Sequence, residues 1–297
     1  MAKEKAKGSI IYEILIVILA ALLVASIIYP KKLTDQEKRN EEISHYRMSE
    51  IEKAALQYHK YNNTYTDTLD KIIEFLRTSP EYAAYVDSVA VGGVDSVLRR
   101  LDEFRRVEET ILEALPQATD TTMIDSLVNM QRDLKAESRQ LAGYVEYVHD
   151  RMKSLPNMPM KPLAAAFKVV DSKQFTLNMD IVANSIENGR LQDAEKGAKE
   201  VLKVIDEVES KFRYVLERIP AYKGEGLDSL KYCPTTGKEF RLVHVDTSAI
   251  KYLNIYSPID SEDIAEVEHN FLKSKIGGLH LHNHGKIESG EKSWEAK

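Results

Sequence analysis

Residues 8–30 read GSIIYEILIVILAALLVASIIYP, and this stretch decides how the chain is organised. Between Ile10 and Tyr29 the only charged residue is Glu13. As a helix rising ~1.5 Å per residue, residues 9–29 would span roughly 31 Å, enough to cross a hydrocarbon core of ~30 Å. The remainder is rich in Glu, Lys, Asp and Arg at amphipathic helical spacing, which is typical of a folded domain in water. The sequence therefore predicts a single-pass membrane protein.

Three interpretations of the first thirty residues compete. A cleaved secretory signal needs an apolar core of about 7–15 residues followed by a small-residue cleavage site. Residues 24–26, Val-Ala-Ser, resemble such a site, but residues 27–29 continue the apolar run beyond it. An uncleaved signal anchor fits the length but does not explain Glu13, because a carboxylate at the centre of a membrane span costs about 2.5–3.5 kcal/mol and indicates a function by default. The third interpretation follows from the spacing around Glu13.

The short basic leader MAKEKAKG ends at Gly8, Glu13 is the fifth residue after it, and Pro30 is the twenty-second. This spacing resembles the type IV pilin and type II secretion pseudopilin family. Its prepilins have a basic leader ending in Gly, then a mature helix with Glu at position five and often Pro at position twenty-two. The stretch EILIVILAALLVASIIYP is also similar to the family's helix in character. Ser9 departs from the pattern, since the family usually has Phe or Met at the first mature position.

The resemblance implies roles and partners for these residues. A prepilin peptidase would cleave between Gly8 and Ser9 on the cytoplasmic side of the inner membrane, leaving the head in the periplasm or outside the cell. In a filament of pilin-like subunits, Glu13 would face the new amino terminus of a neighbour and set the axial register, because an unpaired charge is costly in a water-poor core. Pro30 would bend or locally melt the helix. The simpler alternatives are a carboxylate that is protonated or reaches the interface, and a helix kink at the membrane exit.

Residues 31–61 are polar and helix-forming, and their apolar residues lie at the spacing of one helical face. These apolar residues are Ile43, Tyr46, Ile51, Ala54, Ala55 and Tyr58. Together with the apolar run they predict one long helix over residues 9–61, kinked at Pro30, as in the pilin scaffold. The cluster NNTYTD predicts its end, and TLDKIIEFL predicts a short helix within the connection at residues 62–80.

Residues 81–220 depart from an ordinary pilin. Apolar residues at helical spacing run from Val94 to Leu115, from Ile124 to Met152 and from Leu191 to Ile219, and each stripe stops at a proline. The stretch TLNMDIVANSIEN predicts a shorter helix between the second and third stripes. Long amphipathic helices with short breaks predict an antiparallel bundle or coiled-coil hairpin inserted into the chain. A ligand-sensing bundle of the chemoreceptor type is the alternative, although the sequence contains no visible binding constellation.

Residues 221–297 change character. YCPTTGKEFRLVHVDT, AIKYLNIYSP and GGLHLHNHGKIESGEKSW show the alternation and turn residues of a small antiparallel sheet. The motif CPTTGKEF resembles a Cys-Pro-x-Thr-Gly-x-x-aromatic element of some pilin-like proteins, and a turn is expected at Thr236-Gly237. Cys233 is the only cysteine, which excludes an internal disulfide and a cysteine-rich zinc site. We predict a buried or turn thiol, because no residue beside it in the sequence suggests an activating base.

The histidines of HLHNH, residues 280–284, form the one metal-like cluster. On a strand, His280, His282 and His284 would share a face, where three imidazoles could hold Zn²⁺. A three-histidine site needs closer support than one flat strand provides, so we expect a solvent-facing polar row without metal. No triad, phosphate-binding loop, dinucleotide fingerprint or paired-carboxylate motif stands out, and we expect neither a cofactor nor an enzymatic activity.

Charge and length complete the predictions. The net charge is −6, and the leader is basic, so the rest of the chain carries about −8. This balance argues against a nucleic-acid partner bound through phosphates. We therefore predict a mostly α, α+β protein divided at residues 1–8, 9–61, 62–80, 81–220 and 221–297. The expected function is a pilin-like structural subunit of a type IV filament or type II secretion pseudopilus. The alternative is a single-pass membrane sensor or adaptor with a periplasmic helical bundle, for which cleavage at Gly8 would have no use.

Overall fold

The computed structural model describes residues 8–222, 226–247 and 250–295, without the side chains of residues 9–11 and 220–222. Residues 1–7 of the predicted leader lie outside this range. The chain divides into two compact units. The long-helix unit comprises residues 1–71 and 228–297, and the bundle unit comprises residues 72–227. The helical segment predicted at 81–220 is therefore the larger part of the bundle unit, which interrupts the long-helix unit in sequence.

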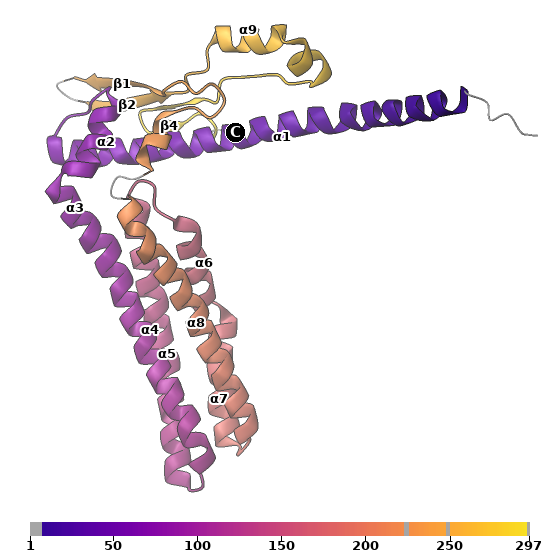
Figure 1. Cartoon of the computed structure of the whole chain (residues 1–297). Coiled ribbons are helices and arrows are strands. Elements are labelled where there is room, and N and C mark those ends of the chain that lie inside the picture. The colour runs from indigo at the N-terminus through magenta and orange to yellow at the C-terminus, as the bar shows by residue number, and fades with distance from the viewer. Residues whose placement is uncertain (1–7, 223–225, 248–249, 296–297) are drawn as a thin grey trace, which may run out of the picture. The chain divides into compact units, whose positions relative to one another are not determined.

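Helix α1 (Gly8–Asn62) is continuous over 55 residues and passes through Pro30 without a break (Figure 1). Its second half buries Met48, Ile51, Ala54 and Ala55 along one face. The helix ends one residue later than predicted, where Asn63 takes a left-handed conformation (φ 56°) and its N–H donates to His59 O at 2.8 Å. Asn tolerates this conformation better than most residues, so the cluster NNTYTD is the physical cause of the helix end.

The long-helix unit contains the predicted antiparallel sheet. Its strands follow the order of the sequence: β1 (Arg241–Asp246), β2 (Lys251–Tyr256), β3 (Lys286–Glu288) and β4 (Glu291–Lys292). Alternation along the strands buries one face of the sheet, and β2 and β3 contact α1. The buried residues of that face are Leu242, Leu253, Ile255 and Ile287.

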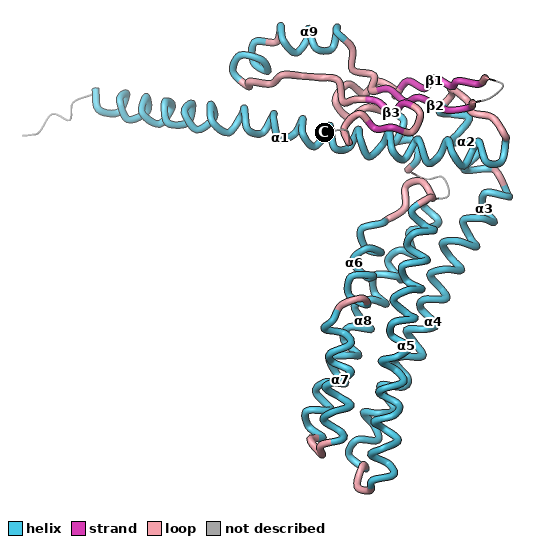
Figure 2. The backbone as a smooth tube through the Cα atoms, turned by 180° about the vertical axis from the view of Figure 1, so that it is seen from behind, coloured by secondary structure: helices cyan, strands magenta, loops and turns pink. Residues whose placement is uncertain are grey.

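Two short helical elements between β2 and β3 were not predicted. Helix α9 (Ser261–His269) begins with a capping box, in which the Asp260 and Asp263 side chains each accept from the other residue's backbone N–H. A π-helical turn, η4 (Leu272–Ile276), follows it. Residues 278–285 then return to the sheet as a loop rather than as a strand (Figure 2).

Helix α2 (Leu69–Thr78) forms where TLDKIIEFL predicted it. In the long-helix unit, the 3₁₀ turn η3 (Leu227–Lys231) is joined to the start of α2 by an ion pair between Lys231 Nζ and Asp70 Oδ1 at 2.7 Å. The Tyr232–Glu239 bridge and the Cys233–Gly237 turn follow it. The expected turn is confirmed: Gly237 has φ 69° and donates to Cys233 O at 2.8 Å.

The bundle unit is an antiparallel helical bundle with a common core (Figure 1). Helix α4 packs against α5 and α8, and the consecutive helices α6 and α7 pack against the other side of α5 and α8. Its elements are α3 (Pro80–Val86), η1 (Asp87–Val91), α4 (Gly92–Ala114), η2 (Leu115–Gln117), α5 (Thr121–Lys153), α6 (Met160–Val170), α7 (Lys173–Glu187) and α8 (Leu191–Tyr222). One core cluster contains Ile111, Leu115, Leu127, Val128, Val182, Ile186, Ala194 and Ala198.

The predicted end of the second stripe is confirmed, because α5 ends at Lys153, just before the stretch LPNMPMKP at residues 155–162. Helix α6, which begins inside this stretch at Met160, was not predicted; Pro162 lies in its first turn, where the missing N–H is not needed. The boundary predicted at Pro220 was wrong. Helix α8 does not stop at Pro220 but continues to Tyr222, because a proline in the last turn removes only one intrahelical hydrogen bond.

Candidate functional site

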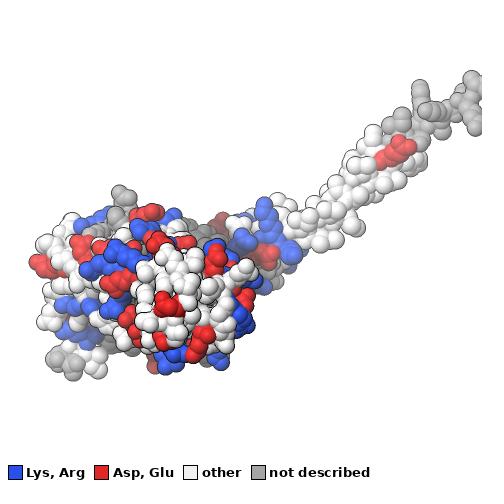
Figure 3. All heavy atoms as spheres, turned by 90° about the horizontal axis from the view of Figure 1, so that it is seen from below, with Lys and Arg blue, Asp and Glu red and all other residues white. Residues whose placement is uncertain are grey.

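The first half of α1 is an apolar surface that no other described segment covers. Twelve large apolar side chains between Tyr12 and Ile28 are 48% to 67% exposed, and they occur on all sides of the helix. Figure 3 shows this part of α1 as an almost uncharged rod. Within the described residues, α1 is the one helix long and apolar enough to cross a membrane.

The predicted site residues lie at the ends of this apolar surface. Gly8 is the first residue of α1, Ser9 follows it in the same helix, and Glu13 is exposed on the next turn. Pro30 is half-buried at the other end, and Lys31 and Lys32 after it are exposed. The arrangement places one carboxylate near the amino-terminal end of the apolar surface and the first lysines directly after it.

The second half of α1 carries a polar cluster that the sequence did not reveal. Glu37 and Ser44 lie two helical turns apart on α1, Cys233 lies in the CPTTG turn, and His284 comes from the loop before β3. All four belong to the long-helix unit, and their exposed fractions are 8%, 0%, 1% and 1%. The cluster joins the carboxyl-terminal region to the helix.

His284 is the centre of this cluster. Its Nε2 lies 2.7 Å from Glu37 Oε1, its Nδ1 lies 2.8 Å from Ser44 Oγ, and Ser44 Oγ lies 3.8 Å from Cys233 Sγ. Thr235 Oγ1, from the same turn as Cys233, donates to both oxygens of Glu37 at 3.1 Å. The carboxylate, imidazole and thiol are therefore held in one hydrogen-bonded group.

The cluster shifts the ionisation of its members. Burial lowers the pKa of His284, but the thiol of Cys233 and the carboxylate of Glu37 outweigh burial and raise it to about 9. Burial raises the pKa of Cys233, but His284 and the backbone N–H groups of Thr235 and Thr236 outweigh it and lower the pKa to about 7. For Glu37 the hydrogen bonds from His284 and Thr235 likewise outweigh burial, so its pKa is lowered. Near neutral pH the arrangement favours an imidazolium between two anions.

These contacts bear on two sequence predictions. The prediction of a buried or turn thiol at Cys233 is confirmed, because Cys233 is 1% exposed and begins the Cys233–Gly237 turn. The reason given for it was incomplete, because His284 is 51 positions away in sequence but lowers the pKa of the thiol from nearby in space. The prediction of a strand with three histidines on a solvent face was wrong. His280 is exposed, His282 is exposed with its Nε2 3.1 Å from Glu41 Oε1, and His284 is buried. The rings of His282 and His284 lie 5.9 Å apart beside Glu41 and Glu37 of α1, so the three histidines do not form a solvent-facing row.

A thiol, an imidazole and a carboxylate are also the groups of nucleophilic catalysis. Reactivity requires both a lowered thiol pKa and access for a substrate. Because Cys233 is 1% exposed, a substrate could reach Sγ only if the CPTTG turn moved away from α1. In this arrangement the cluster holds the sheet region onto α1, together with His45, whose Nε2 lies 2.7 Å from His284 O and whose ring stacks on Trp294.

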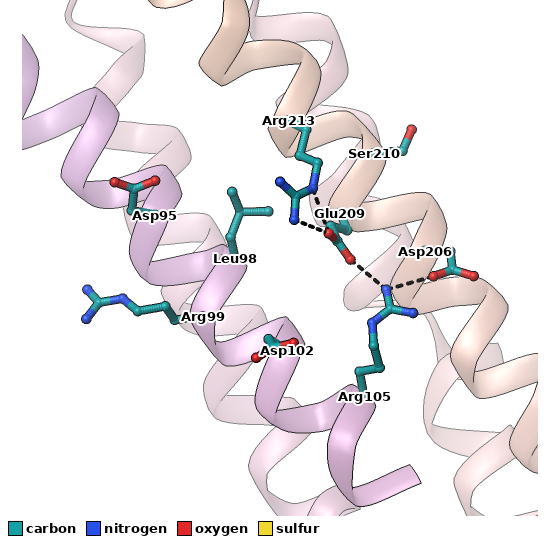
Figure 4. A pocket seen from close by; sticks show the side chains of 9 residues that line it. All are labelled: Asp95, Leu98, Arg99, Asp102, Arg105, Asp206, Glu209, Ser210 and Arg213. Carbon is teal, nitrogen blue, oxygen red and sulfur yellow. Dashed lines mark hydrogen bonds and ion pairs between the residues drawn. The ribbon is translucent and has the colours of Figure 1, made fainter. Parts of the chain in front are cut away.

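The bundle unit has a surface groove between α4 and α8 that bears on the alternative sensor function (Figure 4). Arg105 bridges the two helices by binding Asp206 at 2.7 Å and Glu209 at 2.5 Å, and Arg213 binds Glu209 at 2.6 Å. Burial raises the pKa of Glu209, but hydrogen bonds from the two arginines outweigh it and lower the pKa. These arginines are thus neutralised by the groove's own carboxylates, which leaves little net charge for an ionic ligand.

Comparisons with known proteins add no relatives. No protein-family model matches the chain, and neither the curated proteins nor the solved structures contain a match.

Proposed function

We propose that this chain is a pilin-like or pseudopilin structural subunit of a type IV filament or type II secretion apparatus. Before assembly it is anchored in the inner membrane by the first half of α1, with its amino terminus in the cytoplasm and its head in the periplasm. Its partners are a prepilin peptidase, other pilin-like subunits and the assembly machinery. The proposal rests on the resemblance of residues 8–30 to prepilins.

The structural observation that supports the proposal is the division of α1 into two halves. The first half exposes apolar side chains in all directions, and the second half is partly covered by the sheet region. A membrane can cover the first half before assembly, and the same halves of neighbouring subunits can cover it in a filament. Glu13 lies within this surface, where a carboxylate is costly in either environment unless a partner compensates for it.

We infer the orientation from the basic leader and from the resemblance to prepilins, because Lys31 and Lys32 make the other end of the apolar surface basic as well. The leader contains Lys3, Lys5 and Lys7, and short basic segments stay on the cytoplasmic side of the membrane. The head then lies on the opposite side. The bundle unit makes this head large, which suits a minor or tip subunit better than a major one, because each major subunit must fit a short axial rise.

The first test concerns the mature amino terminus. In cells that contain a prepilin peptidase, we expect the membrane-extracted protein to begin at Ser9, as intact mass or amino-terminal sequencing would detect. Gly8→Val should leave the leader attached. An unprocessed wild-type chain would contradict the proposal and favour a single-pass sensor or adaptor.

The second test concerns Glu13. Glu13→Ala should insert into the membrane at least as well as the wild type, because it removes a costly polar group. We expect its incorporation into filaments, measured by co-purification with the other subunits, to fall at least tenfold. Ser26→Ala is the matched control, since the Ser26 hydroxyl bonds within its own helix, to Leu23 O at 2.8 Å. Equal incorporation of all three proteins would make Glu13 incidental.

A further inference from the structure

A second apolar surface lies on the long-helix unit, at and beside η4. Phe271, Leu272 and Ile276 are 65%, 59% and 43% exposed, and the exposed Lys273 and Lys275 lie between them. Single exposed apolar residues are ordinary on a soluble surface, but three large ones within six residues mark a contact surface. We call residues 271–276 the η4 surface.

The η4 surface lies beside the point where α1 leaves its apolar stretch. Gly277 packs so closely on α1 that an added Cβ would lie 2.5 Å from Leu33 Cδ1. At ~1.5 Å per residue, Leu33 is about 6 Å beyond Tyr29, the last residue of the apolar stretch. The turn η4 contacts α1, and Figures 1 and 2 show α9 farther from α1 than this turn. If α1 crosses a membrane, the η4 surface is held at the level of the lipid headgroups.

The lysines at this surface can bind an anionic lipid layer, and they lie beside the exposed carboxylates Glu262, Glu266 and Glu268 of α9. Lys31 and Lys32 are exposed on α1 at the same level, and Lys273 and Lys275 are exposed on η4. Lysines interleaved with Phe, Leu and Ile are the composition of segments that lie in a membrane interface, where the apolar groups enter the acyl boundary and the lysines bind phosphates.

We propose that the η4 surface is a second membrane contact, which inserts into the leaflet from which α1 emerges and binds anionic phospholipid. It would hold the long-helix unit against the bilayer while the chain is membrane-anchored. The inference depends on α1 crossing the membrane but not on filament assembly, so it can fail while the proposed function stands.

The test uses the full chain in phospholipid vesicles. Trp294→Phe removes the native tryptophan, and Phe271→Trp then places a reporter on the η4 surface. In vesicles of phosphatidylcholine and phosphatidylglycerol with brominated acyl chains, we expect at least a twofold loss of its emission relative to unbrominated lipid. In vesicles of phosphatidylcholine alone, the quenching of this emission should be clearly smaller. Adding Lys273→Gln and Lys275→Gln should make the quenching equal in the two lipid mixtures.

Ile250→Trp in the same background is the matched control. Ile250 is 61% exposed, and the adjacent Lys251 Nζ lies 3.1 Å from Asn63 O at the far end of α1. Asn63 is about 45 Å along the helix from Leu33, so the emission of Ile250→Trp should not be quenched.

Equal emission of Phe271→Trp with and without bromine would overturn the proposal. Equal quenching in both lipid mixtures would overturn the selectivity for anionic lipid. A blue shift that depends on the protein-to-lipid ratio, without quenching, would assign the surface to a neighbouring subunit instead.

Discussion

At the scale of single residues, His284 and Cys233, which lie in one cluster with Glu37, give the stability of the long-helix unit two opposite dependences on pH. The pKa of His284 is raised from 6.5 to about 9, so its stabilising contribution is complete below pH 6.5 and is lost as the pH rises through 9. The pKa of Cys233 is lowered from 9.0 to about 7, so its contribution is present above pH 9 and is lost as the pH falls through 7. Between pH 7 and 9 the two slopes oppose each other.

We therefore expect the stability of the long-helix unit to be nearly constant between pH 7 and 9. Cys233→Ala should remove the rising slope, while Glu37 still favours the His284 imidazolium, so the denaturation midpoint of this variant should fall as the pH rises. Trp294 is the only tryptophan and belongs to this unit, so its fluorescence reports the transition in full-length protein in detergent.

His280→Ala is the control for this experiment, because His280 is exposed and its removal should leave the wild-type profile unchanged. A flat profile for Cys233→Ala would mean that the thiol and the imidazole do not titrate as a coupled pair.

At the scale of elements, the packing of α7 against α8 depends on a glycine. A Cβ added to Gly197 of α8 would lie 2.8 Å from Val182 Cγ2 of α7, so the helices approach too closely for any side chain there. Gly143 of α5 is also in a helix interior, but nothing lies within 4 Å of an added Cβ. A Gly→Ala substitution at Gly143 therefore changes helix propensity alone, whereas the same substitution at Gly197 also changes the packing of α7 against α8.

Gly197→Ala should destabilise the bundle unit, because overpacking typically costs about 1–3 kcal/mol and exceeds the gain in helix propensity. Gly143→Ala should instead stabilise it by roughly 0.5–1 kcal/mol. Thermal unfolding followed by far-UV circular dichroism measures both changes. Stabilisation by both substitutions would show that α7 and α8 can separate at no cost.

At the scale of the whole molecule, each unit buries its own ionisable group. Glu108 of α4 is 0% exposed, and within the described chain neither of its carboxylate oxygens has a hydrogen-bond partner of ordinary geometry. Burial is the main cause that raises its pKa from 4.5 to about 7, against a smaller lowering effect of Gln131. As the pH rises from 4.5 to 7, the unfolded chain loses this proton first, so the bundle unit loses stability over that interval.

Above pH 7 we expect Glu108→Leu to stabilise the bundle unit by roughly 3 kcal/mol, since each unit of pKa shift corresponds to about 1.36 kcal/mol. Because the chain forms two compact units, Glu108→Leu should shift the unfolding transition of the bundle unit, measured by far-UV circular dichroism. The unfolding transition of the long-helix unit, measured by Trp294 fluorescence, should not shift. Glu109→Leu, at the neighbouring exposed position, should change neither by more than about 0.5 kcal/mol. A parallel shift of both transitions would show that the two units unfold together.

Elements with a local periodicity could be predicted from the amino-acid sequence. The apolar run and the amphipathic stripe after Pro30 predicted α1, the stripes from Val94 to Ile219 predicted the long bundle helices, and alternation predicted the sheet. Spacing within the first thirty residues also indicated Gly8, Ser9, Glu13 and Pro30 as site residues. These signals are readable because each element must expose one face to water and another to apolar surroundings, which leaves a period in the sequence.

Which polar groups meet depends on how the chain folds in three dimensions and could not be predicted from the sequence. Glu37 and His284 are 247 positions apart, and no periodicity relates a carboxylate on a helix to an imidazole in a loop. The same reason explains why HLHNH looked like a strand: alternating residues predict a shared face, but one buried hydrogen-bonded histidine in a loop satisfies the same pattern. The close approach of Gly277 to Leu33, which positions the η4 surface, likewise arises from the return path of the chain along α1.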